Sequence, residues 1–438
     1  MPNPRLLLSR VGFFSNPRLL PWDTAKPPDL SQSFLGRAHE GNFTGVIVTK
    51  HPRQHKYQKK QRHFISLHDS WQERLADVVT PLWRLSYEEQ LKVKFEAQKK
   101  IVQTLESYLQ VLHGVSGTVA APHSEGLHCH LHPIIPSYYE VFLRQSSVEP
   151  CLLFHEGGHW RELTVRTNSQ GHTMAIITFH PQGLSQEELC AQKVTLKDFF
   201  TQGPGAVCEL TSLYFQESTM TRCSHQQSPY QLLFGEPHIF EDLLGLKIRI
   251  SPDAFFQINT AGAELLYQTI GELSGVNSNS ILLDICCGTG VIGLSLAQCA
   301  SQVLGVELVE QAVDDARWTA AFNGVTNCEF HAGRAEKILP QLLRSQKDEK
   351  LIVAVVNPAR AGLHHQVVQA IRNCGAIRTL VFVSCKPHGE SMRNFIELCC
   401  PPNSAKKLLG EPFVLRQAVP VDLFPHTPHC ELVLLFTR

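Results

Sequence analysis

The C-terminal half of the sequence predicts an α/β fold built on a doubly wound, largely parallel sheet. From about residue 246 onward, short apolar runs typical of buried strands alternate with longer stretches of helical period. This alternation indicates βα units, in which each helix returns the chain to the next parallel strand. A glycine-rich turn directly after the first run, ILLDI, supports the same fold, because such turns open the helices of doubly wound sheets.

The individual elements follow from local patterns. Residues 86–112 predict a helix, from their apolar period and their Glu-to-Lys spacing. Residues 115–245 predict the strands of an α+β or β-rich domain, in the runs YYEVFLR, EPCLLFHE, MAIITFH, VCELTSLYFQ and HIFEDLLGLKIRIS. The strands expected of the C-terminal sheet are ILLDI, QVLGVE, CEFHAG, LIVAVVN, TLVFVS and ELVLLF, with helices such as LVEQAVDDARWTAAFNG between them.

The length of 438 residues predicts more than one domain, because a single core rarely grows that large. We expect a leader and linker at 1–40, an α+β or β-rich domain at 41–245 and a Rossmann-like domain at 246–438. No apolar run approaches the roughly 18 residues of a membrane span, so we expect no membrane partner. Fourteen cysteines without regular spacing indicate free thiols in a reducing compartment and no iron–sulfur cluster.

The first 22 residues are basic and contain no acidic residue before Asp23. Arg5, Arg10 and Arg18 lie among Leu, Phe and Ser, which is typical of a mitochondrial matrix presequence. The alternative is an N-terminus that is merely basic and unstructured. Several prolines in this segment weaken the amphipathic helix that import receptors recognise.

Residues 50–62 form a basic run in a chain whose formal net charge is zero. Six Lys and Arg side chains are interleaved there with histidines and Tyr57, a composition that suits a phosphate backbone and stacked bases. A solvated loop is the alternative. We expect further phosphate contacts from the helix that follows, through Lys92, Lys94, Lys99 and Lys100.

The glycine turn predicts a site for a nucleotide-like cofactor. Gly288, Gly290 and Gly293 follow a strand and open a helix, where the backbone must turn tightly and approach its ligand. Glu307 ends the next strand, where a carboxylate accepts hydrogen bonds from ribose hydroxyls. The turn alone does not separate NAD from S-adenosylmethionine, and it also occurs as a purely structural turn; Asp284, just before it, favours S-adenosylmethionine.

Cys385 and Glu431 are the candidate catalytic residues. Cys385 follows the apolar run Leu380–Val383 and precedes Lys386, so it lies where a buried strand ends and where a cation favours the thiolate. Glu431 begins another strand-like run near the end of the chain. A thiol and a carboxylate beside a cofactor turn suggest covalent activation of a substrate.

Two strings resemble metal ligands without the spacing that metal binding needs. HEGGH, at residues 155–159, would have to lie on a helix to bring its histidines together, and its two glycines disfavour one. HCHLHP, at residues 128–133, has no matching C-x-x-C partner. We therefore expect no metal site.

Seven segments resemble the S-adenosylmethionine-dependent RNA (uracil-5-)-methyltransferases. They are SPDAFFQINT, DICCGTGVIGLSLA, GVELVEQAVDDA, FNGVTNCEFHAGRAE, NPARAGLH, VSCKP and HCEL, and together they cover most of residues 245–438 in order. The combination of FFQ-N, S-C-x-P and H-x-E is specific to that family. The first 245 residues match far more weakly.

The resemblance implies a role for each candidate residue. Cys385 would attack C6 of a target uracil, and Glu431 would remove the C5 proton. Gln257, Asp284, Gly288, Gly290, Glu307 and Asn357 would contact the cofactor. Asn357 stands where the family usually has Asp in D-P-P-R, and Ala359 replaces the second Pro, so this position gains an amide donor and loses the carboxylate charge.

The resemblance also implies an RNA partner: tRNA, with the T-loop uridine as the usual target, and ribosomal RNA as a further candidate. Two other interpretations stay open. One is a Rossmann enzyme that uses NAD and Cys385 as a thiol catalyst. The other is an RNA-binding protein with a decayed methyltransferase domain, which the substitutions at Asn357 and Ala359 favour and the intact Cys385 and Glu431 oppose.

Overall fold

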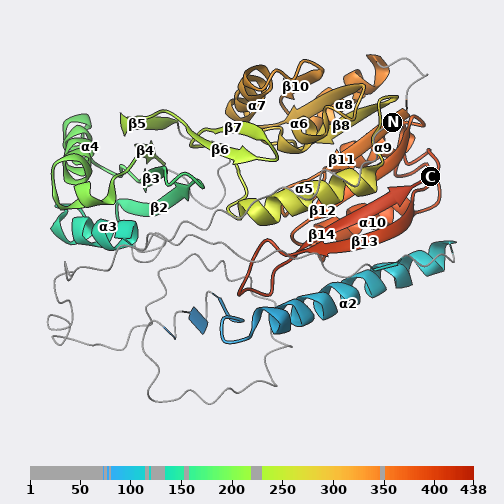
Figure 1. The fold of residues 1–438 in the computed structure, drawn as a ribbon, viewed down its shortest axis with the longest axis horizontal. Helices are drawn as coiled ribbons and strands as arrows, with labels where there is room; N and C mark the ends of the chain where they lie inside the picture. Colours follow the sequence, from blue (N-terminus) through green and yellow to red (C-terminus); the bar gives the residue numbers. More distant parts are fainter. Residues whose placement is uncertain are drawn as a thin grey trace, which may run out of the picture. The chain divides into compact units, whose positions relative to one another are not determined.

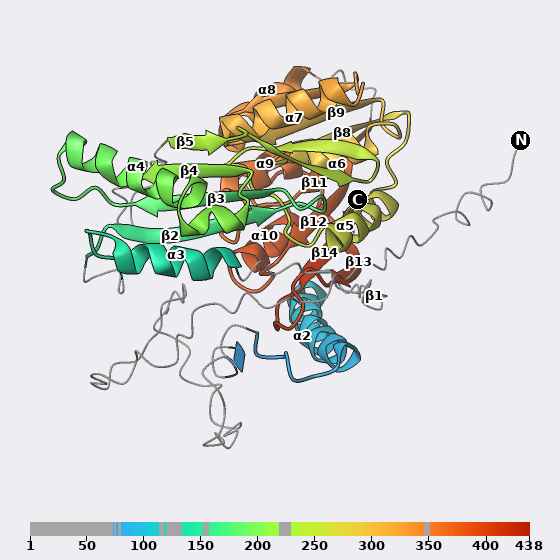
Figure 2. The same cartoon turned by 60° about the vertical axis from the view of Figure 1, so that its left-hand side comes forward.

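The computed structural model describes residues 73, 76–77, 80–113, 118–119, 134–151, 157–218, 229–345 and 351–438. All of them belong to one compact unit, Arg62–Arg438. Within it an eight-stranded sheet carries helices on both faces, and a separate four-stranded sheet is formed by earlier residues (Figure 1, Figure 2). None of the helices in the described ranges is long and apolar enough to cross a membrane.

The eight-stranded sheet has the order β1-β13-β14-β12-β11-β8-β9-β10 and is parallel except for β14, which runs antiparallel between β12 and β13. All six strands predicted for the C-terminal half are present. The strand β13 was not predicted, because its sequence VLRQAVPV mixes polar residues with a proline. The bounds are β1 Thr118–Val119, β8 Ser280–Ile285, β9 Gln302–Glu307, β10 Cys328–Ala332, β11 Leu351–Val356, β12 Ile377–Ser384, β13 Val414–Val421 and β14 Glu431–Thr437.

The two faces of this sheet bury alternate residues of each strand in separate cores. On β8, Ile281 and Leu283 pack with α2 (Tyr87–His113), α8, α9 and α10, whereas Leu282 packs with α5 and α6. The helix α7 completes the second layer through Val313 and Ala316. The bounds are α5 Thr260–Ser274, α6 Val291–Leu296, α7 Glu310–Phe322, α8 Ala335–Ser345, α9 His365–Asn373 and α10 Glu390–Cys399. The predicted α/β class is confirmed.

The four-stranded sheet has the order β2-β3-β4-β5 and mixes parallel and antiparallel pairs. The run YYEVFLR, predicted as a strand, lies instead in helix α3, where Ile135, Tyr139 and Phe142 form a buried stripe of helical spacing. A hairpin, β6-β7, leads into the larger sheet. The bounds are α3 Ile134–Gln145, β2 Trp160–Thr167, β3 Thr173–Phe179, α4 Gln186–Thr201, η2 Pro204–Cys208, β4 Ser212–Glu217, β5 Tyr230–Gly235, β6 Ile239–Leu243 and β7 Leu246–Ile250. The domain boundaries at residues 40 and 245 stay predictions.

The predicted helix at 86–112 is α2, Tyr87–His113. Ser86 and Glu89 cap its start reciprocally, because the Ser86 backbone N–H donates to Glu89 Oε2 (2.9 Å) and the Glu89 N–H donates to Ser86 Oγ (3.3 Å). The helix packs against α10 and β13 (Figure 1). The expectation that Lys94 contacts phosphate is wrong: its side chain is 1% exposed and pairs with Asp422 inside the protein.

Candidate active site

The candidate residues gather at the carboxyl ends of four neighbouring strands, β12, β11, β8 and β9. Cys385, Asn357, the glycine turn and Glu307 follow or end these strands in that order across the sheet. The Asn357 N–H donates to the Ile285 carbonyl (3.2 Å), which ties the end of β11 to the start of the turn. The sheet topology therefore places the predicted nucleophile and the predicted cofactor turn at one edge, as doubly wound sheets do with their ligands.

The glycine turn needs glycine for two different reasons. Gly290 has φ +75°, and a Cβ there would approach the Phe330 ring to 2.7 Å and Ala316 to 2.9 Å. Gly288 has φ +55° but faces open space, with only the Phe255 carbonyl oxygen at 4.0 Å from the position of a Cβ. Gly290 therefore serves close packing of the helix, whereas Gly288 leaves room for a ligand to approach the backbone.

Asp284 and Glu307 stabilise the glycine turn by accepting hydrogen bonds from backbone N–H groups. Asp284 is fully buried, and its Oδ2 accepts the Gly293 N–H (2.9 Å), while its Oδ1 has no partner among the residues that the structure describes. Burial raises the pKa of Asp284 to about 7. Glu307 accepts the N–H of Gly288 through Oε2 (3.0 Å) and those of Leu308 and Val309 through Oε1 (2.8 and 3.0 Å). Asp284 thus fixes the start of α6, and Glu307 fixes the turn against β9.

Gln257 lies in the loop between β7 and α5, which runs beside the turn. Its side chain is 7% exposed. Arg166, on β2 of the four-stranded sheet, donates to the carbonyls of Pro252 (Nη2, 3.0 Å) and Ala254. The carbonyl of Phe255 then lies next to Gly288. Arg166 thus anchors the loop to the four-stranded sheet, and the loop reaches the glycine turn of the eight-stranded sheet.

These features fit a nucleoside cofactor. The turn has open space at Gly288, a carboxylate stands beside it at Glu307, and Leu308, which is 66% exposed, offers an apolar surface for a ring. Gln257 adds an amide that can both donate and accept. The arrangement supports the cofactor roles predicted for Gln257, Gly288 and Glu307, whereas Asp284 and Gly290 contribute mainly to the shape of the turn.

Cys385 and Glu431 are brought together by strand pairing. In the antiparallel pair β12-β14, Ser384 lies opposite Leu432, so the next step of the ladder sets Cys385 beside Glu431. Glu431 also lies opposite Val421 of β13. Its side chain is 4% exposed, and within the described ranges its Oε2 has no hydrogen-bond partner. Burial raises the pKa of Glu431 to about 7, which suits a group that must accept a proton near neutral pH.

Arg360 is a candidate functional residue that the sequence reasoning did not single out. Burial, and then the charge of Glu431, raise the pKa of the Cys385 thiol, while a hydrogen bond from Arg360 and its positive charge lower it. The same guanidinium also opposes the raised pKa of Glu431. A basic residue three positions after Asn357, at the end of β11, was the available indication in the sequence.

Two histidines lie close in sequence to the candidate pair, His388 three residues after Cys385 and His429 two residues before Glu431. Burial lowers the pKa of His388, with a further contribution from Lys386. Burial also lowers the pKa of His429, followed by the charge of Arg360. Both rings are therefore neutral at pH 7, and Arg360 is the cation that acts on both Cys385 and Glu431.

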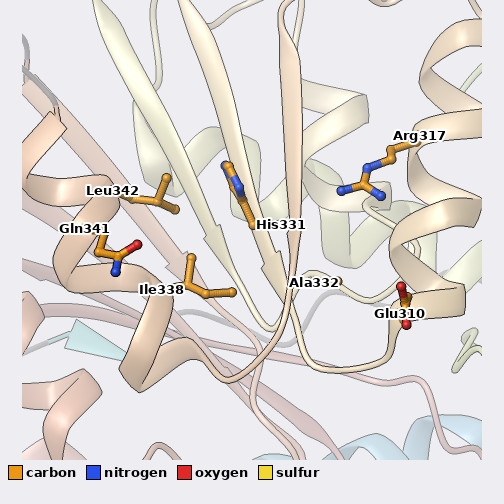
Figure 3. A pocket seen from close by; sticks show the side chains of 7 residues that line it. All are labelled: Glu310, Arg317, His331, Ala332, Ile338, Gln341 and Leu342. Carbon is orange, nitrogen blue, oxygen red and sulfur yellow. The ribbon is translucent and has the colours of Figure 1, made fainter.

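A separate open pocket of about 490 Å³ lies along the edge strand β10, between α7 and α8 (Figure 3). None of the predicted site residues lines it; its walls are formed by Glu310, Arg317, His331, Ala332, Ile338, Gln341 and Leu342. Arg317 donates to the Phe330 carbonyl (2.7 Å) and so covers part of the strand edge.

The metal-like strings hold no metal cluster in the described part of the chain, where no three His, Cys, Asp or Glu side chains converge. The ring of His159 instead contacts the His180 carbonyl through Nδ1 (2.9 Å). His155 and residues 128–133 lie outside the described residues.

Comparison with known proteins points to one family. Residues 276–400 match the family model described as a methyltransferase domain. The mouse protein named tRNA (uracil-5-)-methyltransferase homolog B is 76% identical over 100% of both chains, and the human protein of that name is 68% identical over 99% of this chain and 97% of its own. The fold is similar to the crystal structure of Pyrococcus abyssi tRNA (uracil-54, C5)-methyltransferase with S-adenosyl-L-homocysteine, at 21% identity and a TM-score of 0.54, over 81% of this chain and 85% of that one.

Proposed function

Because the chain belongs to the tRNA (uracil-5-)-methyltransferase family, we propose that it methylates C5 of a tRNA uridine through a covalent bond between Cys385 and C6 of the base. It is a methyltransferase that uses S-adenosylmethionine. The observation that carries the covalent step is the strand register that sets Cys385 beside Glu431, with Arg360 acting on both.

The chemistry explains why a thiol and a carboxylate are needed together. Uracil C5 is too weak a nucleophile to attack a methyl group unaided. Addition of the Cys385 thiolate to C6 moves the electrons of the C5–C6 double bond into an enolate, which makes C5 nucleophilic. Gln257, Glu307 and the turn at Gly288 would hold S-adenosylmethionine, which would supply an electrophilic methyl group on its sulfonium. As C5 accepted that group, the bond between sulfur and the methyl carbon would break and its electrons would stay on the sulfur of S-adenosylhomocysteine.

Glu431 then completes the reaction. Its carboxylate takes the proton from C5, the C5–C6 double bond re-forms, and the Cys385 sulfur leaves as thiolate. Arg360 stabilises the thiolate before attack and again as it leaves, because its hydrogen bond lowers the pKa of the thiol. A base in a folded RNA loop must first be flipped out, which costs a few kcal/mol.

A fluorine at C5 of the target uridine tests the nucleophile. Fluorine cannot be removed as a proton, so wild-type protein with S-adenosylmethionine and 5-fluorouridine tRNA should accumulate a covalent complex, visible as a shifted band on a denaturing gel. Cys385→Ala should form none while still binding S-adenosylhomocysteine. Cys190→Ala removes an exposed thiol on α4 and should behave as wild type. A complex that persists in Cys385→Ala would refute the assignment.

Glu431→Gln tests the base with ordinary tRNA. The amide preserves the shape of the side chain but cannot take the C5 proton, so attack and methyl transfer should proceed and the methylated adduct should accumulate. Full turnover by this variant would show that another group accepts the proton.

We also propose the T-loop uridine of tRNA as the main target, ribosomal RNA as a second substrate, and the mitochondrial matrix as the location. The relative from Pyrococcus abyssi is named for uracil 54, and the location rests on the basic, acid-free first 22 residues. Mapping 5-methyluridine by mass spectrometry in mitochondrial and cytosolic RNA, with and without the gene, tests all three. Loss of the modification from cytosolic RNA alone would contradict the location.

A further inference from the structure

Helix α2 buries a polar stripe where an apolar one is normal. Gln90, Lys94 and Gln98 recur every four residues on one helix face, and they are only 1%, 1% and 4% exposed. Further along the same face the buried residues are apolar, at Val102 and Leu105. Buried polar groups, and charged ones above all, are costly unless partners satisfy them. Gln90 and Lys94 both have such partners beyond the helix, whereas Gln98 Oε1 has none among the described residues.

The partner of Lys94 is the segment that leads from β13 to β14. The Lys94 ammonium donates to Asp422 Oδ1 (2.6 Å) and to the Phe424 carbonyl (2.8 Å). Both charged side chains are 1% exposed. Asp422 also accepts the Phe424 N–H (3.0 Å) and the Tyr87 hydroxyl (3.3 Å). Lys94 therefore fixes the first turn of this connection from inside the protein.

Gln90 fixes the same connection a few residues later. Its Oε1 accepts the His426 N–H (2.8 Å), and its Nε2 lies 3.0 Å from His426 Nδ1. The His426 carbonyl accepts the Leu82 N–H (2.8 Å), just before α2. Residues 422–426 are thus held by α2 and the turn that precedes it at two successive points.

The connection between β13 and β14 ends directly before Glu431. Val421, the residue before Asp422, lies opposite Glu431 in the β13-β14 ladder, and Glu431 is the first residue of β14. No described residue forms a hydrogen bond with the Oε2 atom of Glu431. The placement of that carboxylate relative to Cys385 therefore depends on the backbone of β14 and on the connection before it.

We propose that Lys94 is a positioning residue for Glu431, acting through Asp422 and the connection between β13 and β14. This inference rests on the proposed function, in which Glu431 removes the C5 proton. A displacement of about 1 Å at a reacting group can reduce a rate about a hundredfold. Loss of Lys94 should therefore slow proton removal while leaving the attack of Cys385 on C6 in place.

Lys94→Met tests the proposal because it should increase the share of tRNA that stays in the covalent adduct and decrease the share that is released as methylated product. With ordinary tRNA at saturating concentration, turnover should fall by about a hundredfold, and a covalent adduct should accumulate as in Glu431→Gln. With 5-fluorouridine tRNA the adduct should form at the wild-type rate. Lys337→Met, which removes an exposed lysine on α8, should change neither measurement.

Two further variants separate positioning from loss of folding. Lys94→Met leaves Asp422 buried without its partner, which destabilises proteins strongly. Lys94→Met combined with Asp422→Asn should therefore recover stability, but because it still lacks the bonds of Lys94 to the connection, it should still accumulate adduct on ordinary tRNA. Gln90→Leu removes the contact with His426 without burying an unpaired charge, and it should also accumulate adduct on ordinary tRNA.

Each remaining outcome overturns the proposal in a recognisable way. Wild-type turnover by Lys94→Met would show that Glu431 does not depend on this contact. A merely structural role for Lys94 would show itself in two ways together. Turnover and the 5-fluorouridine adduct would fall equally, and neither Lys94→Met nor Gln90→Leu would accumulate adduct on ordinary tRNA. Failure of wild-type protein to trap 5-fluorouridine tRNA would instead refute the proposed function itself.

Discussion

Glu431 combines burial with a nearby cation, and this combination sets the pH at which it can work. Burial raises its pKa to about 7, and the charge of Arg360 limits that rise. The same guanidinium stabilises the thiolate of Cys385. One exposed arginine therefore couples the protonation of the proposed nucleophile to that of the proposed base.

The pH dependence of adduct breakdown follows from this coupling. Only ionised Glu431 can take the C5 proton, so breakdown of the adduct on ordinary tRNA should slow as the pH falls below about 7. Arg360→Gln removes the positive charge that lowers the pKa of both Cys385 and Glu431. The pH below which adduct breakdown slows should therefore be higher in this variant than in wild type. Rapid-quench measurement of the adduct across the pH range checks this. If the pH at which adduct breakdown slows is unchanged or lower in Arg360→Gln, Arg360 does not act on Glu431.

The same pKa predicts how stability changes with pH. The folded protein keeps a proton on Glu431 between about pH 4.5 and 7, where the unfolded chain has lost it. Stability contributed by the protonated carboxyl is therefore lost as the pH rises through this window, by up to about 3 kcal/mol. Thermal unfolding of Glu431→Gln should show a smaller decline over the window than wild type. An identical decline in both proteins would mean that Glu431 titrates normally.

At residue scale, motifs predicted Cys385 and Glu431 as catalytic residues, whereas the expectation that Lys94 is exposed was wrong. The strings VSCKP and HCEL are local, so they can be read directly from the sequence. Lys94 occurs on a helix rich in charges, where a lysine is normally exposed, and its partner Asp422 lies 328 positions later. Arg360 was overlooked for the same reason, because its role depends on strands that are distant in sequence.

Among the elements, the glycine turn offers the sharpest test of how the cofactor site is built. Gly290→Ala should destabilise the fold and abolish binding of S-adenosylhomocysteine, because φ is +75° and the new Cβ would lie 2.7 Å from the Phe330 ring. Gly275→Ala is the matched control, since Gly275 also has positive φ, +59°, but faces open space at the end of α5. It should lose about 1–2 kcal/mol from backbone strain, with cofactor affinity unchanged.

Calorimetric titration with S-adenosylhomocysteine compares the affinities of the two glycine variants with that of wild type. Equal affinity in Gly290→Ala and wild type would contradict the close packing seen at Phe330.

Elements with a clear local period could be predicted, and those decided by tertiary packing could not. Strands β8, β11 and β12 are buried on both faces and read as continuous apolar runs. Helix α3 was mistaken for a strand because YYEVFLR is rich in aromatic and β-branched residues, and only its packing against Trp160 and Phe199 favours the helix. The strand β13 contains Pro420 in a run otherwise suited to pairing, which argues against a strand when the sequence alone is read.

For the whole molecule, the open question is how a chain of zero net charge holds a polyanion. The basic run at 50–62 lies outside the described residues, and with Lys94 buried, only Lys92, Lys99 and Lys100 of the α2 lysines named above remain exposed. We therefore propose that most of the phosphate contact comes from the basic run itself.

Changing Lys56, Lys59, Lys60 and Arg62 to Ala should weaken tRNA binding and flatten its salt dependence. Each phosphate contact contributes about 0.7–0.9 to the slope of log K against log salt, so the slope should fall by about 3. Affinity for S-adenosylhomocysteine, measured in parallel, should be unchanged because the cofactor turn lies elsewhere in the sequence. An unaltered salt slope would leave the run as a solvated loop.

The central claim is that Cys385 forms the bond to the RNA, and locating that bond tests it most directly. Wild-type protein would be trapped on 5-fluorouridine tRNA with S-adenosylmethionine, digested with protease and nuclease, and sequenced by mass spectrometry. We predict that the modified nucleotide, carrying both the fluorine and the transferred methyl group, is attached to the peptide that contains Cys385. Attachment to any of the other thirteen cysteines, or methylated product without a covalent complex, would contradict the account.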